Sequence, residues 1–298
     1  MAGINAIKKS GGEKAFDLLN SAVLILLAAV TLSPFLYILA ASLSGKQALI
    51  NMEVIFWPVD FQLDNYKMVV NNDQFWQSYK ITAFVIVVST CLQIFMTVIT
   101  AYPLSKRYLP GRKYFMFMVI ISMVFVAPMI PAYLVVKQLH LINTVWAMII
   151  PGAMSSFNMI LCMTYFKSIP EELFEAARVD GMPEFKVLWK IAVPVSMPMI
   201  VTIILFYAVG TWNSYYAAVI YITNPKLRPL QAYLYYIVAQ FSGSSGMETT
   251  TQTELSTQLT PEGLKMAIIL ISTLPIIMIY PFIQKYFIKG VMIGSLKE

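Results

Sequence analysis

The most informative residues lie in one hydrophilic segment, 167–190, between two apolar runs. Its charged and turn-forming residues follow one another closely: Glu171, Glu172, Glu175, Arg178, Asp180 and Gly181. Carboxylates suit the positive end of a helix dipole, and glycine can take the left-handed conformation that ends a helix. Ser168 and Glu171 have the spacing of a capping box. The segment predicts a short charged helix that begins near Pro170 and ends at Gly181.

This expected helix also carries small and apolar side chains, which must be buried against another surface. Ala176 and Ala177 would allow a close backbone approach, and Leu173 and Phe174 could fill a pocket in a partner. The alternative is an amphipathic helix that lies on the inner leaflet of a membrane. Acidic side chains suit an anionic membrane poorly, so these residues by themselves favour a protein partner only slightly.

Other chemistry finds little support in the sequence. The chain has one histidine, His140, which cannot build a metal site alone. Cys91 and Cys162 lie inside apolar runs, where packing is a better explanation than a disulfide or a metal pair. Residues 11–14 lack the G-x-x-x-x-G-K-[ST] spacing of a phosphate loop, so we do not expect this chain to hydrolyse ATP.

The composition indicates a membrane protein. Of 298 residues, 58% are hydrophobic and 12% charged, against about 25% charged in soluble domains. With so few charges, the chain cannot cover a water-facing surface. Its net charge of +6 does not indicate nucleic acid, because the basic residues are scattered between apolar runs. The first fifteen residues resemble no cleavable signal peptide.

Six stretches are long and apolar enough to span a bilayer, which takes about 20 residues. They are Leu18–Leu43, Ile81–Leu104, Tyr114–Val136, Val145–Phe166, Ile191–Tyr221 and Met266–Phe287. Several contain prolines, which we expect to act as ordinary kinks. The prediction is an all-α integral membrane protein with six transmembrane helices.

The basic residues predict the orientation. With the N-terminus inside, fourteen Lys and Arg residues lie on the cytoplasmic side and seven outside, which places both termini in the cytoplasm. We expect a cytoplasmic N-terminal segment at 1–15 and a transmembrane domain at 16–298, with its core at about 75–288. An outer segment at 223–263 contains a low-complexity stretch that predicts a flexible loop.

The hydrophilic segment also carries a family resemblance. Glu175-Ala176-Ala177, Gly181, Ile191 and Pro194 resemble the EAA motif of binding-protein-dependent importer permeases. The longer string Glu-Ala-Ala-Arg-Val-Asp-Gly is similar to the maltose-type carbohydrate permeases, closest to the subgroup that handles complex oligosaccharides. Further matches lie at Ala101-Tyr102, Trp212-Asn213 and Gln284–Phe287, so the resemblance covers about residues 75–297.

The resemblance implies a type I ABC importer permease in a bacterial cell (inner) membrane. The segment 167–190 would then contain a coupling helix that docks on a separate ATPase subunit. The implied docking residues are Glu175, Ala176, Ala177 and Gly181, with Arg178 and Asp180 beside them. The implied partners are a second permease chain, two ATPase subunits that bind ATP and Mg, and an extracellular sugar-binding protein, which the 223–263 segment would face.

A sugar path would need polar and aromatic groups within the membrane, where such groups face the bundle interior or a cavity. The candidates are Gln93, Ser122, Ser155, Ser156, Asn158, Trp212, Asn213, Tyr215, Tyr216 and Ser272. Helix–helix hydrogen bonding is the alternative role for most of them. Asn158 and Asn213 are the stronger candidates, because amides suit sugar hydroxyls.

Four other functions compete with a sugar importer. An ion-coupled secondary carrier typically uses a carboxylate within the membrane, and none lies deep in the expected spans. A membrane-embedded enzyme would need a catalytic cluster, and a purely structural subunit would not need the coupling segment. ABC importer permeases for other small polar solutes share the EAA motif, so the substrate class depends on the longer match.

Overall fold

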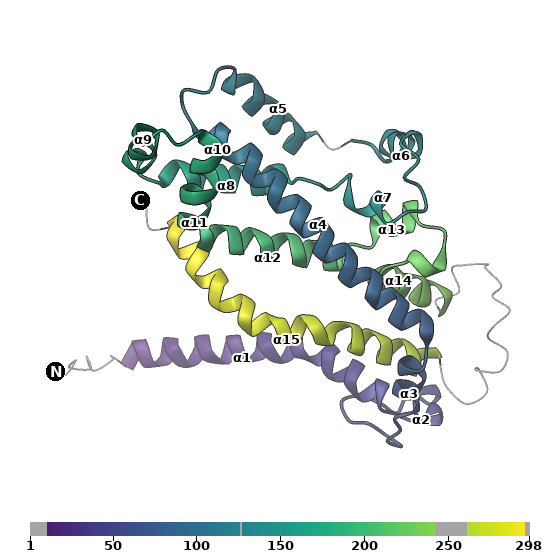
Figure 1. The fold of residues 1–298 in the computed structure, drawn as a ribbon. Coiled ribbons are helices and arrows are strands. Elements are labelled where there is room, and N and C mark those ends of the chain that lie inside the picture. The colour runs from purple at the N-terminus through teal and green to yellow at the C-terminus, as the bar shows by residue number, and fades with distance from the viewer. Residues whose placement is uncertain (1–10, 126, 242–260, 296–298) are drawn as a thin grey trace. The chain divides into compact units, whose positions relative to one another are not determined.

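The computed structural model describes the backbone of residues 11–125, 127–241 and 261–295, and within these ranges it is helical with no strand (Figure 1). The chain divides into two compact units, which are treated separately below. One consists of residues 1–71 and 240–273, and the other of residues 72–239 and 274–298.

The first unit is built on one long apolar helix. Its elements are α1 (Gly11–Ser42), α2 (Lys46–Ile50), α3 (Asp64–Val70) and the beginning of α15 (Pro261–Ser295). The most hydrophobic part of α1 has no buried residue, which is the surface expected of a helix that faces lipid or another membrane chain. Only its end is buried, where Ala40 and Ala41 pack with Leu49 and Met266.

The second unit is organised around α4 (Asp73–Ser105), which packs against two later helices. Asn72 caps this helix, because its side chain accepts hydrogen bonds from the backbone N–H groups of Gln74 and Phe75. The other elements are α5 (Arg112–Val124), α6 (Met129–Gln138), α7 (Trp146–Ile149), α8 (Ser156–Ser168), α9 (Glu171–Val179), α10 (Glu184–Val187), the π-helical η1 (Leu188–Ala192), α11 (Val193–Val195), α12 (Met197–Asn213), α13 (Tyr216–Tyr221), the 3-10 turn η2 (Pro225–Leu227) and α14 (Leu230–Phe241).

The core of this unit lies where α4 meets α8 and α12. Ala101 of α4 packs there with Phe166 and Cys162 of α8 and with Ile203 of α12. Cys162 is therefore a packing residue, as its apolar surroundings in the sequence indicated. Cys91 is a free thiol on the exposed face of α4.

The expectation of six continuous spans is not confirmed. Among the described residues, three helices are long and apolar enough to cross a membrane, Gly11–Ser42, Asp73–Ser105 and Pro261–Met278. Counting each of two bent helix pairs as one span raises this number to five. The chain leaves the helical path at Pro128 and Pro151, two of the prolines that had been expected to act as ordinary kinks.

The fourth and fifth expected spans show how prolines divide a helix. Between α7 and α8 the chain is non-helical around Pro151, and the segment Glu184–Val195 meets α12 at 84°. Pro194 has no N–H to donate to the carbonyl group four residues earlier, and the π-helical turn η1 precedes it. A break of this kind exposes polar backbone groups, which other parts of the chain must then satisfy.

Part of the segment 223–263 is helical in the structure. It contains η2 and the apolar helix α14. The low-complexity stretch that suggested flexibility lies at 242–253, outside the described residues.

One hydrogen bond attaches the start of α14 to α4. The hydroxyl group of Thr82 accepts a 2.7 Å hydrogen bond from the backbone N–H of Leu230, and both residues are buried. We predict that Thr82→Val lowers the stability of the purified chain by about 1–3 kcal/mol, because a buried donor is left without a partner. Thr82→Ser keeps the hydroxyl and should behave like the unmodified chain in thermal unfolding. Equal melting temperatures for the Val and Ser variants would contradict this assignment.

Candidate functional site

The helix expected in the hydrophilic segment is present as α9, but it begins differently. Ser168 is the last residue of α8, and its hydroxyl donates to the carbonyl oxygen of Tyr165 at 2.8 Å. The capping-box prediction is therefore wrong. Ile169 precedes a proline, which disfavours the helical conformation, so the chain stays extended and α9 starts only after Pro170.

The end of α9 agrees with the sequence. Gly181 has φ of +75°, the left-handed conformation that glycine adopts without strain. The N–H of Gly181 donates to the carbonyl oxygen of Arg178, and that of Met182 to the carbonyl oxygen of Ala177. These two bonds form a Schellman motif, which stops the helix and turns the chain toward α10.

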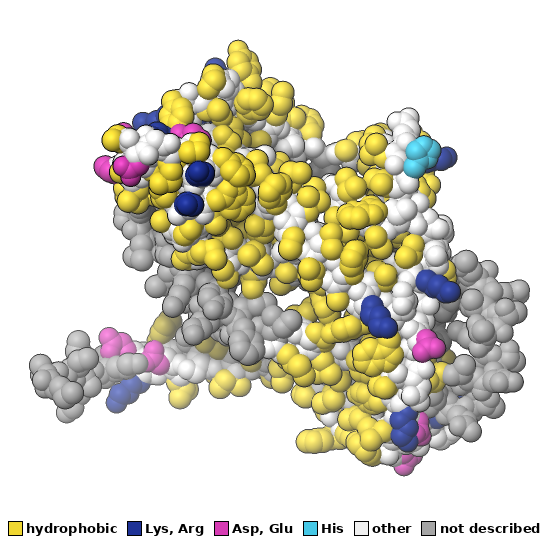
Figure 2. Space-filling view, viewed as in Figure 1, with side chains coloured by type: hydrophobic (Ala, Val, Ile, Leu, Met, Phe, Trp, Pro, Cys, Tyr) yellow, Lys and Arg dark blue, Asp and Glu magenta, His cyan; other side chains and the backbone are white. Residues whose placement is uncertain are grey.

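The two faces of α9 have different surroundings. Phe174 is fully buried and Ala177 nearly so, in the same core as Ala101 and Phe166. The sequence suggested that Phe174 could fill a pocket in a partner. This is wrong, because Phe174 packs against Tyr102 of its own chain. Glu175 and Ala176 are exposed, and so is the apolar side chain of Leu173. Acidic side chains gather over this helix in Figure 2.

A cluster of polar side chains holds α9 in place, and we call it the clamp. It consists of Tyr102, Lys106, Tyr108, Glu171, Arg178 and Glu184. Arg178 donates to three of its members: to Glu184 Oε1 at 2.7 Å, to Glu171 Oε1 at 3.2 Å and to the hydroxyl of Tyr108 at 2.6 Å. The hydroxyl groups of Tyr102 and Tyr108 both donate to Glu184. The clamp joins the end of α4, the beginning and end of α9, and α10.

Lys106 is the most buried charge in the clamp, with 5% of its surface exposed. Its Nζ atom lies 3.0 Å from Glu171 Oε2 and 3.2 Å from the centre of the Phe174 ring. Burial lowers the pKa of Lys106, and the ion pair with Glu171 opposes this shift. For Arg178, burial alone would lower the pKa, but the hydrogen bonds to Glu184 and Glu171 raise it above its usual range.

Arg178 has a structural role within the clamp. The sequence placed it beside the docking residues, whereas the structure commits its guanidinium group to three partners within the chain. Sequence analysis did not identify Lys106, Tyr108 or Glu184 as part of this site. The sequence did contain one indication of this cluster: Glu171 and Arg178 are seven residues apart and therefore lie on one face of a helix.

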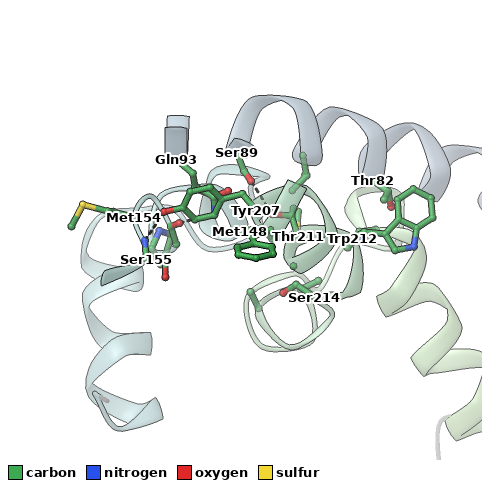
Figure 3. A pocket seen from close by; sticks show the side chains of 18 of the residues that line it. Thr82, Ser89, Gln93, Met148, Met154, Ser155, Tyr207, Thr211, Trp212 and Ser214 are labelled. Atoms are coloured by element: carbon green, nitrogen blue, oxygen red, sulfur yellow. Dashed lines mark hydrogen bonds between the residues drawn. The ribbon is translucent and has the colours of Figure 1, made fainter. Parts of the chain in front are cut away.

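A second site is a cavity of about 370 Å³ in the same unit, lined by α4, α7, α8, α12 and the segments around α13 (Figure 3). Of the candidate path residues, Gln93, Ser155, Asn158 and Trp212 line it. Asn213 and Tyr215 do not line it, and Tyr215 instead stacks on Tyr235. The remaining candidates also lie elsewhere: Ser122 and Ser156 hydrogen-bond to each other, Tyr216 is exposed, and Ser272 belongs to the first unit.

The polar groups of the cavity satisfy the backbone between α7 and α8. Gln93 Nε2 donates to the carbonyl oxygen of Gly152 at 2.8 Å, and the hydroxyl of Tyr207 accepts from the N–H of Ser155 at 3.0 Å. Tyr207 also shares a 2.7 Å hydrogen bond with Thr97. Sequence analysis missed Tyr207 and Thr97, because one tyrosine and one threonine in apolar helices look like ordinary packing residues.

The comparisons with known proteins identify the family. Residues 89–293 match the family described as binding-protein-dependent transport system inner membrane component. The chain belongs to this family. It is thus a permease, the membrane component of an ABC transport system, and not an enzyme.

Three relatives illustrate the similarity. Over its whole length, the permease is 41% identical to all of protein LplC of Bacillus subtilis (strain 168). It is 37% identical over 96% of its length to 99% of the polygalacturonan/rhamnogalacturonan transport system permease protein YtcP from the same organism. A chain in the crystal structure of a bacterial ABC transporter involved in the import of the acidic polysaccharide alginate matches with a TM-score of 0.87 and 33% identity, over 95% of the permease and 100% of that chain.

We predict that the buried charge of Lys106 makes its partner indispensable. Glu171→Gln should destabilise the permease, because the ammonium group keeps its charge in an apolar setting. The loss should be smaller than the about 3–5 kcal/mol typical of a fully buried pair, because Glu171 is half exposed. Adding Lys106→Met should restore part of the melting temperature. The matched control is Glu172→Gln, on the exposed side of α9, and a double variant less stable than Glu171→Gln would refute the pairing.

Proposed function

We propose that this permease is one of two membrane subunits of an ATP-driven importer that carries an oligosaccharide across the bacterial inner membrane. The observation that carries the proposal is the exposed edge of α9, Glu175 and Ala176, within a motif typical of coupling helices. Two relatives named for the transport of polysaccharides support the substrate class.

The family suggests the remaining subunits, and the charge distribution suggests the orientation. A second permease chain would complete the pathway, and an extracellular sugar-binding protein would deliver the substrate. Two ATPase subunits would bind ATP and Mg and drive the cycle. The excess of Lys and Arg favours an orientation with both termini and α9 in the cytoplasm, where the ATPases are.

In this arrangement α9 would transmit force from the ATPases to the membrane helices, and the substrate would move toward the cytoplasm. Closure of the ATPases would move the docked α9, and the clamp would pass this movement to the end of α4. The permease would switch between inward-open and outward-open states, with the bound partners shifting the balance between them. The segment 223–263 would lie on the outer side, next to the binding protein.

We predict that Glu175→Lys uncouples ATP hydrolysis from uptake. The substitution reverses an exposed charge on the proposed docking face, so assembly with the ATPase should weaken while the permease remains in the membrane. The assay is ATP-dependent sugar uptake into proteoliposomes that contain the complete importer. Glu53→Lys, the same reversal on an exposed residue between α2 and α3, is the matched control. Normal uptake by Glu175→Lys would exclude a docking role.

We predict that Gly181→Asn also reduces uptake while leaving the permease stable. Asparagine tolerates the left-handed conformation better than other side chains. A Cβ atom at this position meets no atom within 4 Å, so the fold has room for it. The new side chain would therefore interfere only with a docked partner. Unchanged uptake with an unchanged melting temperature would remove Gly181 from the docking surface, and Gly12→Asn serves as the control, because it too has open space.

A further inference from the structure

The cavity is elongated along α4. Thr82 and Gln93 both line it, and eleven residues of helix at 1.5 Å each separate them by about 16 Å. In Figure 3 the labelled side chains extend from Gln93, Met154 and Ser155 at one end to Thr82 and Trp212 at the other. Its volume of about 370 Å³ lies within the range of small-molecule sites. The dimensions suit a short stretch of a linear chain better than a compact solute.

The lining is polar without being charged. None of the described residues that line the cavity is acidic or basic, and the polar groups are hydroxyls and amides. The apolar surface comes from side chains such as Val85, Phe206 and Trp212. A carboxylate placed here would lose its hydration without gaining a cation, which is a large cost. An uncharged ring with several hydroxyl groups would meet both kinds of surface.

Gln93 gives the cavity a defined hydrogen-bonding character. Its amide nitrogen is committed to the carbonyl oxygen of Gly152, so the orientation of the amide follows from that bond. The other atom, Oε1, is buried and has no hydrogen-bond partner among the described residues. A buried acceptor without a partner is costly, and a hydroxyl group of a ligand would satisfy it. A carboxylate would be repelled, because both groups are acceptors.

We propose that this cavity is a sugar subsite of the permease itself and that it takes an uncharged, hydroxyl-bearing stretch of the oligosaccharide. The proposal rests on the proposed function and adds the location and the charge class of the substrate contact. The proposed ligand of this subsite is uncharged, whereas the alginate named for one relative is an acidic polysaccharide. If the importer carries such chains, their carboxylates are held outside this cavity.

The test measures sugar binding to the complete importer, purified with its partner subunits but without the binding protein. The probes are trigalacturonate and its carboxyl-reduced counterpart, in which a neutral hydroxymethyl group replaces each carboxylate, together with neutral galactan and arabinan trisaccharides. Quenching of tryptophan fluorescence reports binding, and Trp212→Phe identifies the part of the signal that comes from the cavity. We expect at least one neutral probe to bind at least tenfold more tightly than trigalacturonate.

Two substitutions at Gln93 examine the role of its acceptor. Gln93→Met keeps the approximate shape and should weaken binding of the neutral probe about tenfold. Gln93→Lys introduces a cation and should shift the preference toward trigalacturonate. Gln77→Met is the control, because Gln77 lies on the same helix, outside the cavity, and its Nε2 also donates to a backbone carbonyl oxygen. Melting temperatures and subunit composition confirm that each variant is assembled.

Three results would overturn the proposal: trigalacturonate binding as tightly as the neutral probes, neutral binding unaffected by Gln93→Met in an assembled importer, or no binding of any neutral probe. ATPase stimulation by the sugar-loaded binding protein is measured in parallel and depends on α9. If the unmodified importer shows no such stimulation, the proposed function is contradicted. If stimulation is present but no sugar binds, only the proposed subsite is contradicted.

Discussion

The buried ammonium group of Lys106 is the constraint on which the position of α9 depends. Removing this charge from water is expensive, and the carboxylate of Glu171 and the ring of Phe174 offset the cost. Both partners belong to α9, whereas Lys106 directly follows α4. Separating the two elements would leave the charge buried or force it into water with loss of both contacts. Arg178 extends the same constraint to α10, so these elements form one body.

The same helix connects this body to the cavity. Tyr102, near the end of α4, donates to Glu184 in the clamp, while Gln93 and Ser89 lie earlier on α4 and line the cavity. Because α4 is continuous between these residues, it can transmit a displacement with little loss. In the proposed importer, a movement of α9 would reach the sugar subsite through packed and hydrogen-bonded contacts. The site therefore has two parts, and α4 joins them.

The sequence predicted those features that depend on local chemistry. Gly181 ends α9 with a positive φ, and Cys162 packs in the core, as expected. The sequence could not predict which face of α9 turns inward, because Phe174 is buried by Tyr102, which lies on another helix, and Lys106 meets Glu171 across 65 positions of sequence. The capping box failed for a local reason, the proline after Ile169, which the spacing rule does not consider.

The broken fourth span and the polar lining of the cavity have a common origin. A continuous helix through residues 145–166 would have bonded its own backbone and needed no side chain from its neighbours. The break at Pro151 and Gly152 frees backbone groups, which Gln93 and Tyr207 satisfy from α4 and α12. Irregular backbone at membrane depth persists only where it is buried in protein or lines a cavity. The break that counted against six regular spans is thus what orients the amide of Gln93, and it leaves the oxygen of that amide without a partner among the described residues.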